Sequence, residues 1–158
     1  MIPLPHWEYS YRVRPEEEER TVKASLREVS ISPKAAVEVC REIKGMRLEE
    51  ARKYLEEVAA MKRPVPFKRY VKDIGHRREL RGWKIGRYPA KVARYLLKLL
   101  DNLENNAIDK GLDPSRLRII HACALKGRKI RKYIPRAFGR ATPYFDTLVH
   151  VELIAREE

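Results

Sequence analysis

The spacing of hydrophobic residues divides the chain into stretches typical of strands and stretches typical of helices. In TVKASLREVSI (residues 21–31), Val22, Ala24 and Leu26 alternate with polar neighbours, as in a strand with one buried face. The patterns predict, in chain order, a strand at 21–31, helices at 33–44, 48–62 and 89–109, and strands at 116–126 and 148–155. Elements of this number and length predict an α+β fold, in which three helices cover a small three-stranded antiparallel sheet.

Residues at the ends of the predicted helices support these boundaries. Ser32 and Pro33 are typical of a helix start, with the serine as the N-cap and the proline in the first turn. Gly45 and Gly111 follow the first and third helices and suit the left-handed conformation that often ends a helix. Pro64 is expected to end the second helix, because proline disfavours helical backbone in the residue before it.

Strict alternation in the strand at 116–126 predicts a shared face for five residues, Leu117, Ile119, His121, Cys123 and Leu125. His121 and His150 fall on two strands that could be neighbours, so their rings could approach each other. Two histidines do not form a structural zinc site, which needs four ligands, and we predict no metal site. A catalytic pair of Cys123 and His121 is the less common alternative to a cysteine packed in the sheet.

Two further segments do not fit into this core. Residues 63–87 form a loop of about 25 residues, which is long for a compact domain unless the loop is functional or ordered by a partner. Residues 127–146 connect two strands that should pair, and arms of about ten residues would extend roughly 33 Å beyond the sheet. Pro135 and Pro143 exclude a regular central ladder there. We therefore expect a long protruding β-hairpin, held in place by a partner, and a basic loop insertion.

Charge is distributed unevenly along the chain. The 158 residues carry a net charge of +13, with 11 basic and 12 acidic side chains in residues 1–60 and 24 basic and 10 acidic in residues 61–158. Two blocks are the most basic: residues 62–94, with 12 bases, and residues 126–140, with seven bases and no acid. Because unrelieved like charges repel one another, such blocks indicate a polyanionic partner, and nucleic acid is the usual one.

Composition and motifs exclude several classes of protein. Hydrophobic residues make up 44% of the chain, which excludes full disorder, and no apolar run approaches the ~20 residues of a membrane span. Cys40 and Cys123 form no CxxC pair, so reduced thiols are expected. The sequence contains no phosphate-binding, zinc-protease or nucleophile-elbow motif. Asp73 and Glu79 are the only acids in the two basic blocks, so a metal-dependent nucleic-acid enzyme would lack ligands.

The first 20 residues are predicted to form an N-terminal extension of a single RNA-binding domain at 21–158. Aromatic residues at Trp7, Tyr9 and Tyr11 precede an acidic run and indicate a segment that becomes ordered on a partner. The start of the sequence lacks the continuous apolar stretch of a secretory signal.

The basic loop at 63–87 mixes cations with aromatic side chains. This mixture favours RNA, because unpaired bases stack on aromatic rings while cations contact phosphates; the alternative is a solvated loop with aromatic residues in the core. The aromatic residues are Phe67, Tyr70, Trp83 and Tyr88. The residues predicted to bind RNA in and beside the loop are Lys62, Arg63, Lys68, Arg69, Lys72, His76, Arg77, Arg78, Arg81, Trp83, Lys84 and Arg87. Those in the arm are Lys126, Arg128, Lys129, Arg131, Lys132, Arg136 and Arg140.

Five blocks of sequence occur in a characteristic order and spacing. They are SPKAAVEVCREIKGM (32–46), VPFKRYVKDIGHRR (65–78), GRYPAKVARYLLKLL (86–100), GLDPSRLRIIHACALKGR (111–128) and IPRAFGRATP (134–143). Together they resemble the family of large-subunit ribosomal protein twenty-two, called seventeen in eukaryotes, over roughly residues 20–155. The loop at 63–87 looks like the insertion of the archaeal and eukaryotic branch of this family.

The resemblance implies a structural constituent of the large ribosomal subunit, not an enzyme, that binds its rRNA and helps assemble it. Its hairpin would line the nascent-peptide exit tunnel. The implied tip consists of Tyr133, Ile134, Pro135, Arg136, Ala137, Phe138, Gly139 and Arg140. Implied partners are the rRNA, neighbouring ribosomal proteins at the tunnel exit and the nascent polypeptide, in the cytoplasm, with no cofactor except Mg²⁺ bound to the rRNA.

One position departs from the bacterial pattern of this family. Bacterial members often have a base where Phe138 stands, and several bases on the returning arm, whereas residues 141–149 here contain none. We therefore do not transfer antibiotic or arrest-peptide contacts of the bacterial tip to this chain. A free-standing RNA- or DNA-binding regulatory protein is the alternative interpretation of the same basic surface.

Overall fold

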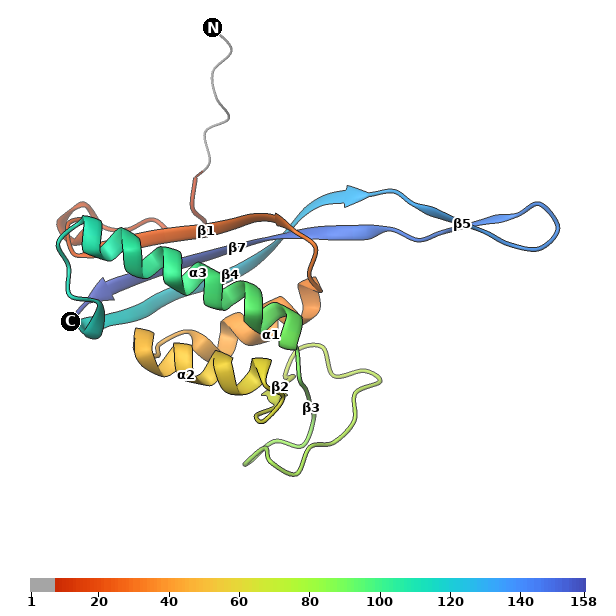
Figure 1. The fold of residues 1–158 in the computed structure, drawn as a ribbon, viewed down its shortest axis with the longest axis horizontal. Coiled ribbons are helices and arrows are strands. Elements are labelled where there is room, and N and C mark those ends of the chain that lie inside the picture. The colour runs from red at the N-terminus through yellow and green to blue at the C-terminus, as the bar shows by residue number, and fades with distance from the viewer. Residues whose placement is uncertain (1–7) are drawn as a thin grey trace, which may run out of the picture.

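The main sheet runs through the centre of the protein. The computed structural model describes residues 8–158, so residues 1–7 of the predicted extension lie outside the described part. Within the described residues the sheet has three antiparallel strands in the order β1 (Thr21–Val29), β7 (Asp146–Glu157) and β4 (Leu117–Ile130), as Figure 1 shows. The last strand of the sequence therefore lies between the other two.

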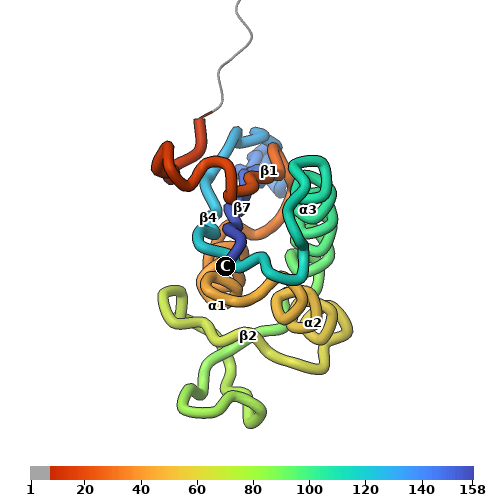
Figure 2. Tube along the Cα trace, turned by 90° about the vertical axis from the view of Figure 1, so that its left-hand side faces the viewer, coloured from red at the N-terminus to blue at the C-terminus, as the bar shows by residue number. Residues whose placement is uncertain are grey.

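The helices pack on one side of this sheet. Residues 8–158 contain three α-helices, α1 (Pro33–Ile43), α2 (Leu48–Ala59) and α3 (Ala90–Asp109). Helix α1 packs against β4, α3 packs against β1, and α2 lies against α3 (Figures 1 and 2). Short 3₁₀ turns occur at Pro15–Glu17 (η1) and Pro114–Arg116 (η2). The predicted combination of three helices and a three-stranded antiparallel sheet is confirmed.

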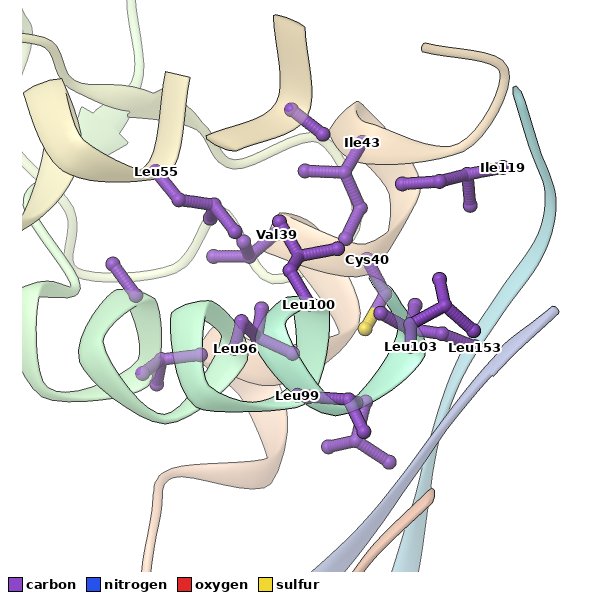
Figure 3. Packing of buried hydrophobic residues seen from close by; sticks show 14 of the residues in the cluster. Val39, Cys40, Ile43, Leu55, Leu96, Leu99, Leu100, Leu103, Ile119 and Leu153 are labelled. Atoms are coloured by element: carbon purple, nitrogen blue, oxygen red, sulfur yellow. The ribbon is translucent and has the colours of Figure 1, made fainter. Parts of the chain in front are cut away.

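The hydrophobic core fills the space between the sheet and the helices (Figure 3). Leu96, Leu100 and Leu103 of α3 are fully buried, as helical spacing predicts. Leu99 is fully buried as well, whereas Leu97 is only partly buried. The buried face of α3 is broad because this helix packs against both β1 and α2.

The helix boundaries follow from local chemistry, with one exception. Ser32 caps α1 by accepting a hydrogen bond from the Ala35 amide at 3.5 Å, and Gly45 ends its turn at φ 90°. Helix α2 ends at Ala59, earlier than the expected stop at Pro64, because Met61 adopts φ 56°.

Backbone hydrogen bonds beyond α2 complete a Schellman motif. The amide of Met61 donates to the carbonyl of Val58 at 3.0 Å, and the amide of Lys62 donates to the carbonyl of Glu57 at 2.9 Å. Glycine usually occupies the left-handed position of this motif, so a methionine there gives no sequence signal for the helix end.

A β-bulge changes which side chains of β4 face the core. The register with β7 shifts between Ile119 and His121, so Ile120 is an additional residue in β4. Beyond it, Ala122 and Ala124 pack against the core, and His121 lies on the opposite face of the sheet. The predicted shared face from Leu117 to Leu125 is therefore wrong beyond the bulge, because one inserted residue reverses the alternation.

The two sheet histidines lie apart from each other. His121 is opposite Ile154 in the ladder, whereas the Nδ1 atom of His150 accepts a hydrogen bond from the Glu28 amide at 3.1 Å. The His150 ring also covers Gly127, where a Cβ atom would lie 2.5 Å from Nε2. The predicted approach of the two histidine rings is therefore wrong, and a side chain at position 127 would require the His150 ring to move.

Part of the N-terminal extension lies against the outer face of the sheet. Ser10 donates two hydrogen bonds to Glu152 Oε2, from its amide at 2.9 Å and from its hydroxyl at 2.7 Å. The Ser10 hydroxyl also lies 3.0 Å from His121 Nε2, and the Tyr11 ring stacks on His121 with centroids 5.2 Å apart. Glu152 is only 1% exposed, so these contacts seal a buried carboxylate.

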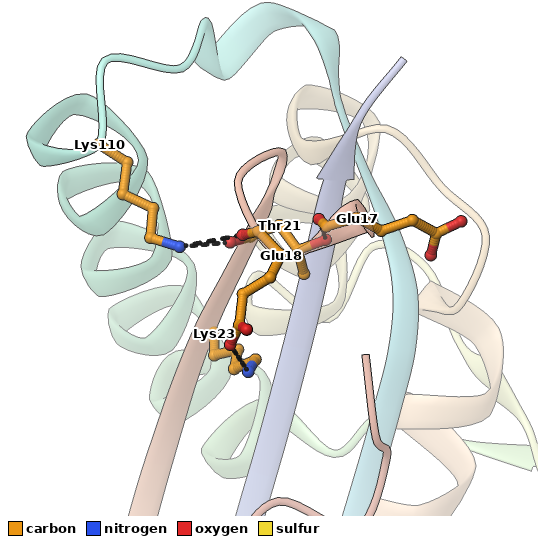
Figure 4. A network of polar contacts seen from close by, with 5 residues as sticks. All are labelled: Glu17, Glu18, Thr21, Lys23 and Lys110. Atoms are coloured by element: carbon orange, nitrogen blue, oxygen red, sulfur yellow. Dashed lines mark hydrogen bonds and ion pairs between the residues drawn. The ribbon is translucent and has the colours of Figure 1, made fainter. Parts of the chain in front are cut away.

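The acidic run is also held by its own chain (Figure 4). Thr21 Oγ1 donates to the carbonyl of Glu17 at 2.6 Å, and Lys110 Nζ donates to the carbonyls of Glu18 and Thr21 at 3.3 and 2.9 Å. Lys23 forms an ion pair with Glu18 at 3.1 Å. The prediction that the extension becomes ordered only on a partner is thus wrong for residues 10–20, because buried Glu152 and the end of α3 bind them.

Ser10→Ala is expected to loosen the N-terminal segment and to increase severalfold the rate at which a thiol reagent modifies Cys123. Burial, and then the charge of Glu152, raise the pKa of the Cys123 thiol, and a hydrogen bond with Ser10 lowers it by a smaller amount. Losing the cover of the segment therefore exposes a thiol whose reactivity burial now limits. Reaction with a chromogenic disulfide reagent at pH 8 measures the rate.

Cys40 serves as the internal control in this labelling experiment. Burial, and then the nearby Cys123, raise the pKa of its thiol to about 12, so Cys40 should stay unmodified in both native proteins. Equal Cys123 rates in the wild type and in Ser10→Ala would contradict an anchoring role for Ser10.

Candidate nucleic-acid interface

The connection between β4 and β7 extends away from the helices (Figure 1). The main ladder runs as far as the pair Ile130 and Asp146, and beyond it β5 (Tyr133–Pro135) pairs with β6 (Ala141–Pro143). Both prolines lie at the ends of this short second ladder. That placement fits the missing amide hydrogen of proline, which cannot contribute to the middle of a ladder.

The arm reverses direction in a tight turn. Phe138 has φ 58° and Gly139 has φ 65°, which is the pair of positive angles that a type I′ hairpin turn requires. The Arg140 amide closes the turn by donating to the carbonyl of Ala137 at 3.5 Å, and the Arg136 amide donates to the carbonyl of Arg140 at 2.8 Å. A positive φ is unfavourable for a bulky residue such as Phe138. The side chain of Phe138 is also 96% exposed. A large apolar side chain thus stands at the end of the arm without support from its own chain.

The cations of the arm point into solvent. All arm residues predicted to bind RNA, from Lys126 to Arg140, are exposed. Within residues 8–158, one of these cations forms an ion pair: Nε of Arg128 lies 3.9 Å from Oε1 of Glu28. Both side chains are more than half exposed. Such a distant, exposed ion pair neutralises little charge. The arm therefore presents concentrated positive charge that the described part of the chain does not offset.

The basic loop is closed at its base by a second, two-stranded sheet. Strand β2 (Val65–Pro66) pairs with β3 (Gly86–Arg87), and an isolated bridge joins His76 to Ile85. Every loop residue predicted to bind RNA is exposed. Two of them pair with carboxylates of this chain, since Lys68 Nζ lies 3.0 Å from Glu42 and Arg63 lies 3.3 Å from Glu57.

The aromatic residues of the loop divide into buried and accessible ones. Phe67 is 2% exposed and belongs to the core, so its ring cannot stack on an RNA base. Trp83 is 37% exposed, and its Nε1 donates to the carbonyl of Phe67 at 3.0 Å. Tyr70 and Tyr88 are half-buried. The Arg69 guanidinium lies 5.6 Å from the centre of the Tyr70 ring, which combines an aromatic face with a cation.

A buried carboxylate that sequence reasoning missed holds the start of the loop. Glu38 of α1 is fully buried and accepts hydrogen bonds from the amides of Lys68, Arg69 and Tyr70 at 3.2, 2.8 and 2.9 Å. Three successive amides on one carboxylate fix the backbone of this segment. Its position in the sequence could have indicated burial, because Glu38 lies next to Val39 among the buried residues of α1.

Residues 8–158 contain no group of three or more histidine, cysteine, aspartate or glutamate side chains arranged to hold a metal ion. In the same part of the chain, no helix is both long and apolar enough to cross a membrane. The exposed chemistry of the described surface is thus dominated by lysine and arginine on the arm and the loop. A mixed α/β domain with these two basic projections has the features of a nucleic-acid-binding protein.

Comparisons with known proteins identify the family. Residues 24–156 match the family described as Ribosomal protein L22p/L17e. The chain is 63% identical over 154 residues to large ribosomal subunit protein uL22 of Thermofilum pendens, covering 98% of this chain and 99% of the relative. It is 55% identical to the protein of that name in Archaeoglobus fulgidus, covering 96% of this chain and 98% of the relative.

The chain belongs to the Ribosomal protein L22p/L17e family. A third relative, uL22 of Methanopyrus kandleri, is 49% identical over 96% of both chains, and these named relatives are all archaeal. The predicted family and its archaeal type are confirmed. Membership of a ribosomal protein family also agrees with the prediction that the chain is not an enzyme.

Proposed function

We propose that the chain is a structural constituent of the large ribosomal subunit, where it binds rRNA and helps assemble and stabilise the particle in the cytoplasm. The observation that carries this proposal is the unneutralised positive charge of the arm, on a chain that belongs to a ribosomal protein family. Cations on such an arm release counterions from RNA phosphates, which favours association. RNA supplies the negative charge that the described part of the chain lacks.

The arm is proposed to thread between RNA segments and to line the nascent-peptide exit tunnel with its tip. Its ladder is too narrow and too polar to bury a core of its own, so contacts with RNA would hold it. The tip from Tyr133 to Arg140 would then carry Phe138 toward the nascent polypeptide. Arginine and lysine on the arm would mostly contact phosphates, because folded RNA is recognised largely by shape and backbone.

The basic loop at 63–87 is proposed as a second rRNA contact. Its exposed cations and the accessible face of Trp83 suit phosphates and unpaired bases. Neighbouring ribosomal proteins at the tunnel exit are the expected protein partners. Mg²⁺ would enter only as an ion bound to the rRNA, since the proposed role needs no cofactor.

Sedimentation of lysates from an archaeal host that expresses the tagged chain tests this proposal. The protein should sediment with the large subunit at moderate salt, and nuclease or high salt should release it, because phosphate contacts weaken as salt rises. Release by salt and nuclease together distinguishes RNA contacts from protein contacts. Recovery mainly in light fractions after gentle lysis would contradict the proposal and favour a free-standing regulatory protein.

A further inference from the structure

A cavity lies between the basic loop and the beginnings of two helices. Three segments line it: residues 32–35 at the start of α1, residues 67–74 of the loop, and residues 87–92 at the junction of β3 and α3. Its volume of about 760 Å³ falls within the ~300–1,000 Å³ typical of pockets that bind small organic groups. The cavity is therefore large enough for one nucleotide, but no helix or strand of RNA fits into it.

The walls of this cavity combine positive charge with apolar surface. The cations that line it are Lys34, Arg69, Lys72, Arg87 and Lys91. Asp73 is the one carboxylate among the lining residues. Val71 and Ile74 contribute apolar surface, and Tyr70 and Tyr88 contribute aromatic rings. This composition suits a ligand with a flat, partly apolar ring and an anionic group.

The lining is held in place by contacts within the chain. Glu38 binds three successive amides, including those of Arg69 and Tyr70, so this wall has a fixed backbone. On the other side, Arg87 Nη2 donates to the carbonyl of Asp73 at 3.0 Å and ties the loop to β3. A cavity formed before binding needs little ordering when a ligand enters, which favours affinity.

We propose that this cavity binds a single unpaired nucleotide of rRNA, with the base inside against the tyrosines and its phosphate on the surrounding cations. The inference rests on the proposed function, because it names the part of the RNA that the loop contacts. Bases within a duplex are stacked and unavailable, whereas bulged and looped-out bases can enter a pocket. The neighbouring cations would contact the phosphates on either side of the inserted nucleotide.

Binding of the full chain to three short RNA hairpins tests this proposal. The first hairpin has a one-nucleotide bulge, the second carries an abasic site at the bulge, and the third is fully paired. The bulged hairpin should bind about tenfold more tightly than the abasic one, because the abasic bulge has no base to stack on the tyrosines. Uridine and adenosine monophosphates serve as free-nucleotide probes and should bind far more weakly than the bulged hairpin.

Ala35→Trp provides a variant that fills the cavity without a change in charge. Ala35 lines the cavity and is partly exposed, so the indole should occupy the site of the base. This variant should lose the preference for the bulge yet bind the paired hairpin normally. Ala60→Trp, at the exposed C-cap of α2, is the matched control and should keep the preference. If Ala35→Trp fails to fold, Lys72→Gln with Lys91→Gln replaces it.

Each outcome of this experiment decides one question. Equal, salt-dependent binding of the bulged and abasic hairpins would overturn the cavity proposal and leave the rRNA-binding function intact. Monophosphates that bind as tightly as the bulged hairpin would identify a free nucleotide as the ligand and would also overturn it. Failure to bind any of the hairpins would contradict the proposed function itself.

Discussion

Replacing Glu38 with alanine is expected to lower the free energy of unfolding by about 3 kcal/mol, since each buried amide left without its acceptor costs ~1–3 kcal/mol and three amides are affected. The fully buried carboxylate accepts hydrogen bonds from the amides of Lys68, Arg69 and Tyr70, and alanine leaves all three amides without this acceptor. Urea denaturation measures the stability, and hydrogen exchange at the three amides should become faster.

Glu42→Ala is the matched control, one helical turn further along α1. Its carboxylate lies 3.0 Å from Lys68 Nζ, but the lysine side chain is 46% exposed. An exposed ion pair contributes ~0–1 kcal/mol, so this variant should be nearly as stable as the wild type. Similar stability of Glu38→Ala and Glu42→Ala would show that the buried carboxylate does not hold the loop.

Neutralising the outer part of the arm is expected to weaken RNA binding by about 100-fold or more at moderate salt while the domain stays equally stable. The change replaces Arg131, Lys132, Arg136 and Arg140 with glutamine. These side chains are exposed, and the arm contributes little to the core, so the melting temperature should not fall. Each lost phosphate contact lowers the salt dependence of log Kd by ~0.7–0.9, so four should lower the slope by about 3.

A second quadruple variant distinguishes the effect of the arm's cations on RNA binding from the effect of total net charge. Arg41, Lys53, Arg94 and Lys98 are exposed on the three helices, and their replacement with glutamine removes the same net charge. This control should lose much less affinity if the arm provides the contacts. Equal losses in the two variants would contradict a specific role for the arm and indicate that net charge alone drives binding.

Local sequence patterns predicted the elements correctly where neighbouring residues decide the structure. Ser32 and Pro33 begin α1 because their capping chemistry acts within one turn. The uneven charge indicated a nucleic-acid partner, and the five ordered blocks indicated the family, which the family match over residues 24–156 confirms. Such features depend on residue type and spacing alone.

The errors arose where distant segments or unusual backbone angles decide the outcome. Met61 ends α2 in a position normally held by glycine, and Ile120 adds a residue that reverses the faces of β4. The sequence pattern did not indicate the role of Glu38, and Ser10 was predicted to lie in an extension that becomes ordered on a partner. Each gained its role from a partner at least 30 residues away in the sequence.

The amino-acid sequence by itself determined the three helices, the three strands of the main sheet, the concentration of bases in two segments and the family, because these properties reside in local spacing and composition. The tertiary structure alone decided that His121 and Cys123 face away from the core, that Glu38 holds the loop, and that a charged cavity lies between the loop and two helices. The physical reason is burial: a carboxylate or a histidine takes its role from the groups that surround it once water is excluded, and those groups come from elements far apart in the chain.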